Sequence, residues 1–137
     1  MRRFALLLVS AGMMLAALNL PCLAQDFRPY AGSSLDEKYS REASKAAPDK
    51  ESQVYTTNDT FDQVYAFYKT LYKEHTMRAS PPKLPTGQQI RWAFFIIDGG
   101  KDLVTSKHWM KIQWPFVDGT DGKDIRQVTV IQVVRAK

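Results

Sequence analysis

Three aspartates, Asp118, Asp121 and Asp124, recur at every third position of a glycine-containing segment and could direct three carboxylates at one cation. Carboxylate oxygens are preferred ligands of Ca²⁺, but the usual calcium loop has oxygen ligands at alternate positions and a distant Glu. Asp-Gly pairs are also common in hairpin turns. We therefore expect a solvated turn here, with a weak calcium site as the alternative.

Other residue patterns that carry chemistry are missing from the sequence. His75 and His108 are the only histidines, and neither has a second ligand at metal-binding spacing. The sequence has no Gly-x-Ser-x-Gly elbow and no phosphate-binding loop. Asp98 and Asp102 fall in a predicted turn, where solvation gives little reason for a shifted pKa. We expect no catalytic residue and no cofactor.

Residues 1–24 have the three-part order of a secretory signal peptide. The start carries two arginines, residues 4–18 are almost all apolar, and a short segment of polar and small residues follows. The apolar run is shorter than the roughly 18 residues of a membrane-spanning helix. Cys22 and Ala24 are small residues at the −3 and −1 positions, so we expect cleavage between Ala24 and Gln25. The alternative is an uncleaved anchor. The general secretory route predicts a periplasmic or secreted protein.

Without this leader, 113 of the 137 residues remain. Their net charge is +3, because the whole chain has a net charge of +5 and the leader contains two arginines and no acidic residue. No cluster of about five to eight Lys and Arg is present, so nucleic acid is not an expected partner. The one cysteine belongs to the leader. Packing alone must therefore stabilise the domain.

The remaining chain divides into a polar, partly ordered arm over residues 25–53 and an α+β domain over residues 54–137. Ser34-Leu35-Asp36-Glu37 fits a helix capping box, but few large apolar residues follow it. For the arm, a helix, an extended strand and a mobile segment all remain open.

The main helix is predicted by a second capping box, Thr60 with Gln63, which follows a β-prone run at residues 54–57. Apolar and aromatic side chains then recur at three- and four-residue spacing, which places them on one helical stripe: Phe61, Val64, Tyr65, Tyr68, Leu71, Tyr72 and His75.

Three strands follow, at residues 88–98, 108–117 and 126–134, separated by Gly- and Asp-rich turns. In the middle strand, one predicted face holds Met110, Ile112, Trp114 and Phe116, and the other holds Trp109, Lys111 and Gln113. The order strand, helix, strand, strand, strand predicts an α+β fold with one main helix packed on an antiparallel sheet.

The first and last of these strands are apolar on both faces. Such a strand normally lies between two layers, so something should cover the face that the helix leaves open. The arm, a second subunit and another partner or ligand are all candidates. The predicted interaction surface is formed by Phe95, Ile97 and Trp109.

The segment 55–69 resembles a pattern in small exported bacterial proteins of unknown function. In that pattern, Tyr-x-Thr-x-Asp-Ser/Thr leads into a helix with Val-x-x-Phe-Tyr-Lys, as in Tyr55 to Thr60 followed by Val64 to Lys69. Tyr30-Ala31-Gly32-Ser33 is similar to an accompanying Tyr-Pro-Gly-Ala element, without its proline and last alanine. The resemblance implies a bacterial envelope setting, a partly extended segment 30–39 beside residues 54–57, and no activity.

The sequence thus predicts an exported, non-catalytic binding or protein-interaction module without a membrane span once the leader is removed. A homodimer or another envelope protein is the expected kind of partner. A calcium-binding protein or hydrolytic enzyme is one alternative, and a structural or stress-related envelope component is another.

Overall fold

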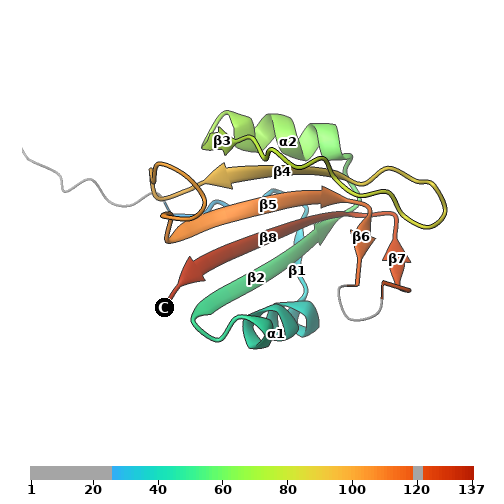
Figure 1. Ribbon diagram of the computed structural model, residues 1–137, viewed down its shortest axis with the longest axis horizontal. Helices are drawn as coiled ribbons and strands as arrows, with labels where there is room; N and C mark the ends of the chain where they lie inside the picture. The colour runs from blue at the N-terminus through green and yellow to red at the C-terminus, as the bar shows by residue number, and fades with distance from the viewer. Residues whose placement is uncertain (1–25, 119–121) are drawn as a thin grey trace, which may run out of the picture.

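A computed structural model describes residues 26–118 and 122–137. The predicted signal peptide and Asp121 lie outside the described residues. The fold is α+β, as predicted, with a six-stranded antiparallel sheet in the order β1-β2-β8-β5-β4-β3 (Figure 1). These strands span Ser34–Leu35, Lys50–Thr57, Thr129–Ala136, His108–Trp114, Arg91–Ile96 and Lys73–His75, respectively. A separate two-stranded ribbon pairs β6 (Phe116–Val117) with β7 (Ile125–Arg126).

Helix α2 (Phe61–Lys69) covers one face of the sheet over β4 and β5 (Figure 1). The predicted capping box is confirmed, since Gln63 N donates to Thr60 Oγ1 at 3.2 Å and Thr60 N donates to Gln63 Oε1 at 2.9 Å. The core between helix and sheet includes Phe61, Val64, Tyr68, Phe95, Met110, Ile112 and Ile131. Burying each such side chain contributes roughly 1.5 to 3 kcal/mol.

The predicted extension of this helix to His75 is wrong. Helix α2 ends at Lys69, and residues 73–75 form the edge strand β3, in which Lys73 pairs with Ile96 and His75 with Phe94. Because these backbone groups find partners on β4, the chain leaves the helix even though its apolar spacing continues. Tyr72 remains buried in the turn.

The predicted antiparallel arrangement of the later strands is confirmed by the pairing of β4 with β5 and of β5 with β8. The middle strand, however, ends at Trp114, because Pro115 has no N–H for the ladder. Phe116 therefore does not share a face with Met110. It belongs to β6 and packs against Val54 and Val130 on the opposite side of the sheet.

The N-terminal segment contacts both faces of the sheet. Strand β1 pairs with β2 at Ser34 to Thr56 and Leu35 to Tyr55, as the resemblance implies. Helix α1 (Glu37–Ala46) then packs on the face opposite α2, with Asp36 rather than Ser34 as its N-cap (Figure 1). Strand β2 begins at Lys50, within the predicted arm.

Residues 26–33 lie on the α2 side of the sheet, where Phe27 and Tyr30 pack against the main core.

Among the described residues, neither helix has the length and apolar character to cross a bilayer.

Candidate functional site

A groove of about 650 Å³, here called the α1 groove, lies between α1 and the sheet face that α2 leaves open. Its walls are formed mainly by Tyr39 and Ala43 from α1, Val54 from β2, Phe116 from β6 and Val130 from β8. Strand alternation places three polar side chains among these walls: Lys111, Gln113 and Gln132. The groove is therefore apolar with a small polar floor.

Lys111 is the central polar residue of this floor. It lies in β5, directly across from Phe94 in β4 and Gln132 in β8, so the three side chains share one face. Burial lowers the pKa of the Lys111 ammonium, and no carboxylate in the described part of the chain offsets this effect. Within the described residues, Lys111 forms no ion pair, although Glu42 and Asp118 also line the groove.

The two glutamines of the floor differ in their hydrogen bonding. Gln113 Nε2 donates to the carbonyl of Pro115 at 3.3 Å. The Gln132 side chain makes no hydrogen bond to any described residue and is half-buried. Gln132 and Lys111 thus place two unengaged donors beside each other on adjacent strands.

Aromatic residues form the end of the groove near the ribbon. The Tyr39 and Phe116 rings meet edge to face with centroids 4.6 Å apart, and the Arg126 guanidinium lies 4.6 Å from the Phe116 centroid. Burial and a hydrogen bond to Asp124 raise the pKa of the Tyr39 hydroxyl. Arg126 Nη2 lies 3.5 Å from Asp36 Oδ2 without hydrogen-bond geometry, so the stacked guanidinium is only weakly neutralised.

Comparison with known protein families, curated proteins and solved structures finds no match. The α1 groove is therefore interpreted from its own residues.

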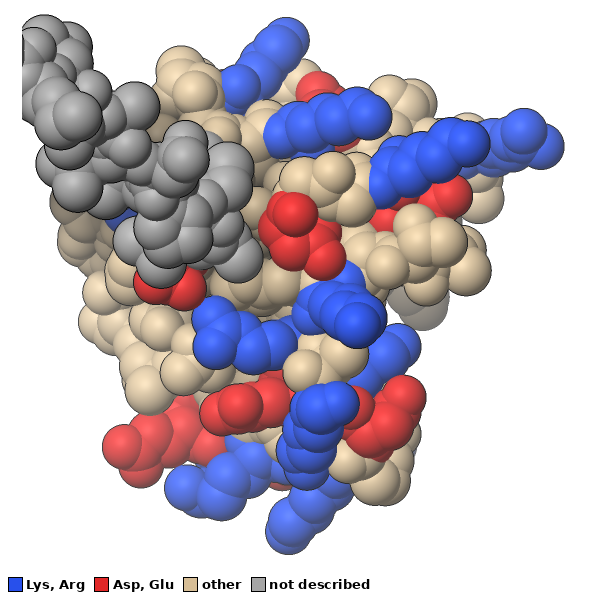
Figure 2. Space-filling view, turned by 90° about the vertical axis from the view of Figure 1, so that its left-hand side faces the viewer, with Lys and Arg blue, Asp and Glu red and all other residues tan. Residues whose placement is uncertain are grey.

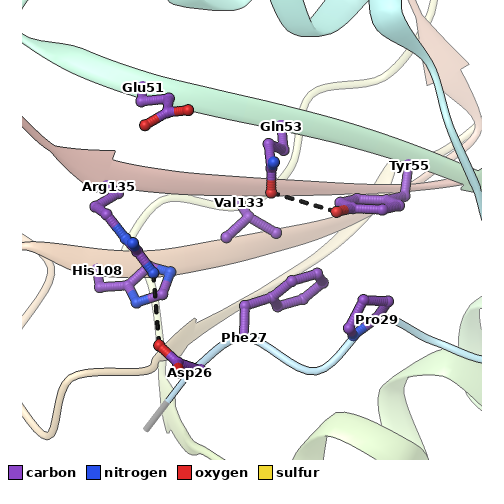
Figure 3. A pocket seen from close by; sticks show the side chains of 9 residues that line it. All are labelled: Asp26, Phe27, Pro29, Glu51, Gln53, Tyr55, His108, Val133 and Arg135. Atoms are coloured by element: carbon purple, nitrogen blue, oxygen red, sulfur yellow. Dashed lines mark hydrogen bonds and ion pairs between the residues drawn. The ribbon is translucent and has the colours of Figure 1, made fainter. Parts of the chain in front are cut away.

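A smaller pocket of about 270 Å³ lies on the α2 side (Figure 3). Figure 3 shows His108 beside Arg135, whose guanidinium is 3.8 Å from the Asp26 carboxylate. Burial and the positive charge of Arg135 lower the pKa of His108. The described residues give this imidazole no hydrogen-bonded carboxylate that would orient it as a base. The described residues of this pocket therefore include no hydrogen-bonded acid/base pair.

The predicted aspartate site is only partly within the described residues. Asp118 N donates to the carbonyl of Asp124 at 2.9 Å, and the Asp124 carboxylate accepts from the Tyr39 hydroxyl at 3.2 Å. Asp121 is not described. Over residues 26–118 and 122–137, no three Asp, Glu, His or Cys side chains gather around one point.

The predicted interaction surface is wrong for two of its three residues. Phe95 and Ile97 are buried beneath α2, with 0% and 1% of their surface exposed. Trp109 lies on the opposite face, half-buried, with its ring centroid 6.3 Å from that of Phe94. Both faces of β4 are apolar, so alternation alone could not show which face α2 covers.

The alternation of residues correctly placed Lys111 on the face of β5 opposite Met110 and Ile112, but Lys111 was not predicted to be a site residue. The sequence feature that could have identified Lys111 is a lysine in the middle of a strand whose neighbouring strands are apolar on both faces.

The charged residues on the surface are mixed in sign. Figure 2 shows Lys and Arg interspersed with Asp and Glu over one face of the molecule. That face offers no continuous basic patch for a polyanion.

Proposed function

We propose that this protein is an exported, non-catalytic binding module of the bacterial cell envelope that takes up a small, mainly apolar molecule in the α1 groove. The single observation that carries the proposal is the size and lining of that groove. Its volume of about 650 Å³ lies in the range of small-molecule sites, roughly 300 to 1,000 Å³. Few convergent polar groups in an apolar cleft are typical of such sites.

A non-catalytic role agrees with the surroundings of the polar floor. Lys111 has no described acid or base within hydrogen-bonding distance that would exchange protons with it. Gln113 and Gln132 do not titrate, and the carboxylate of Asp98 is engaged by Ser106, Lys107 N and Gly100 N. Export is supported by the leader-like sequence of residues 1–24.

Binding can be tested with the neutral fluorescent probe N-phenyl-1-naphthylamine and the purified protein. We expect a saturable rise in probe emission with one site per chain. Ala46→Trp should reduce the apparent affinity at least about tenfold, because the indole would occupy the groove that Ala46 lines.

The matched control is Ala66→Trp, which adds the same side chain to an exposed position of α2. It should bind the probe as the unmodified protein does. Absence of saturable binding by the unmodified protein, or equal binding by Ala46→Trp, would contradict the proposal.

A further inference from the structure

The polar floor of the α1 groove carries a positive charge, that of Lys111, to which no described residue supplies a negative partner. Among the described residues, Lys111 is the one ionisable side chain that the six-stranded sheet contributes to the groove. A cation held among apolar side chains is costly unless it is paired. An anionic group on a ligand would supply the pair that Lys111 does not find among the described residues.

The position of Gln132 beside Lys111 indicates which kind of anionic group would fit. Its side chain lies directly across from Lys111 on the adjacent strand and makes no hydrogen bond to a described residue. An ammonium and an amide N–H₂ side by side can donate to the two oxygens of one carboxylate. Neither residue provides a forked guanidinium for a larger oxyanion.

The rim of the groove limits the total charge of an occupant. Glu42 and Lys45 from α1 and Asp118 beyond β6 also line the groove. Glu42 and Lys45 are exposed, so solvent and salt screen their charges more than that of Lys111. A ligand with several negative charges would place some of them near Glu42 or Asp118, which is unfavourable.

The remaining wall is apolar, with Val54, Val130 and Phe116 buried and Tyr39 and Ala43 half-buried. We infer that the α1 groove binds a monocarboxylate with an apolar body, whose carboxylate is held by Lys111 and Gln132. This inference rests on the proposed function and names the ligand class of the same groove.

The experiment displaces N-phenyl-1-naphthylamine from the protein with decanoate and with decanol, which share a ten-carbon chain and differ in charge. Below the micelle concentration, decanoate should displace the probe at a concentration at least about fivefold lower than decanol. Lys111→Met should abolish this preference by weakening decanoate and leaving decanol unchanged or tighter, because methionine keeps the apolar length without the charge.

The matched control is Lys101→Met, which removes the same charge from an exposed loop position outside the groove and should keep the preference for decanoate. Gln132→Leu provides a second variant and should reduce the preference in part.

Two failures can be distinguished. If the unmodified protein does not bind the probe, the proposed function fails, and this inference fails with it. If the probe binds but decanoate and decanol compete equally, or if Lys111→Met keeps the preference, the carboxylate inference is overturned and the binding function stands. An equal loss in Lys101→Met and Lys111→Met would also overturn it, since the effect would then reflect overall charge.

Discussion

At the scale of single residues, Lys111 opposes the stability of the fold. Burial lowers the pKa of its ammonium, and no charge on residues 26–118 or 122–137 compensates, so the folded state disfavours the charged form. Ionisable side chains with pKa values shifted by burial in a cleft are typical of functional sites, which agrees with a ligand that pairs with Lys111.

We therefore expect Lys111→Met to increase the free energy of unfolding at pH 7 by about 1 kcal/mol, because methionine fills the same space without a buried charge. Urea denaturation of both proteins measures this difference. Lys45→Met, at an exposed position, should change the free energy by no more than about 0.5 kcal/mol. A destabilised Lys111→Met would mean that the ammonium has a stabilising contact.

The same comparison has a defined pH dependence. A lysine whose folded pKa lies below its unfolded pKa of 10.5 gives the unfolded state more protons over that interval, so stability rises with pH there. The unmodified protein should therefore recover part of the lost stability as pH rises from 7 towards 10.5. The advantage of Lys111→Met should shrink over the same range, and a constant advantage would contradict the assigned cause.

Residue patterns with a local cause were predictable from sequence. Thr60 and Gln63 satisfy each other's backbone groups within one turn, so their spacing alone identified the start of α2. Lys111 and Gln132 lie 21 positions apart, and only the register of β5 with β8 brings them together. The candidate site therefore could not be predicted before the sheet was known.

At the scale of elements, α1 is attached to the sheet mainly through serines. None of its residues is fully buried. Ser44 Oγ accepts from Ser52 N at 3.0 Å and donates to Ser52 O at 3.2 Å, while Ser40 Oγ accepts from Val54 N at 2.8 Å. These hydroxyls occupy backbone groups that β2 would otherwise present along an open edge.

This attachment also explains why α1 was not predicted firmly. Helix periodicity is recognised from large apolar residues, and the segment offers mainly Tyr39 and Ala43 to the sheet. The serines that make its sequence resemble a linker are the side chains that bind it to β2. Their partners lie 8 and 14 positions away on the other side of a turn.

We expect the double variant Ser40→Ala/Ser44→Ala to lose about 1 to 3 kcal/mol of unfolding free energy, because backbone groups of β2 lose their partners. Urea denaturation measures the loss, and light scattering should show concentration-dependent association through the uncovered edge. Ser34→Ala is the control and should be close to neutral, because Ser34 is exposed and its side chain forms no hydrogen bond with a described residue. An unchanged double variant would show that α1 does not depend on these hydroxyls.

At the scale of the whole molecule, the segment 26–30 ties the beginning of the described chain to the core. The Phe27 ring centroid lies 5.4 Å from that of Tyr55 and 5.9 Å from that of Tyr68. Tyr68 donates its hydroxyl to the Arg28 carbonyl at 2.8 Å, and Tyr72 donates to the Asp26 carbonyl at 3.0 Å while accepting from Arg28 N at 2.8 Å.

The position of this segment beside α2 could not be predicted from the sequence, since its polar composition and Pro29 are typical of a linker. Tyr68 and Tyr72 were predicted as core residues of one helical stripe. That prediction explains why their rings are buried, but it does not identify the hydrogen-bond partners of their hydroxyls. Buried hydroxyls require partners, and here backbone groups of a segment some 40 positions earlier provide them.

These tyrosines make the attachment sensitive to alkaline pH. Burial raises the pKa of both Tyr68 and Tyr72 above the usual value of 10.0. Above pH 10 the unfolded chain loses phenolic protons that the folded chain keeps, so the stability contributed by these groups is fully present below pH 10 and is lost as pH rises towards the folded pKa. Tyr72→Phe removes one of these groups, so its unfolding free energy should fall less steeply between pH 9 and 11.

At pH 7 the same variant should be less stable by about 1 kcal/mol, because the backbone of residues 26 and 28 loses a hydrogen-bond partner. Hydrogen exchange locates the effect: the Arg28 amide should lose protection in Tyr72→Phe, while amides in the centre of β5 keep theirs. Tyr65→Phe is the control, because its hydroxyl donates to Glu74 and not to this segment. It should leave the Arg28 amide protected, and equal loss of protection in both variants would mean that the segment is held by the rings of α2 rather than by the Tyr72 hydroxyl.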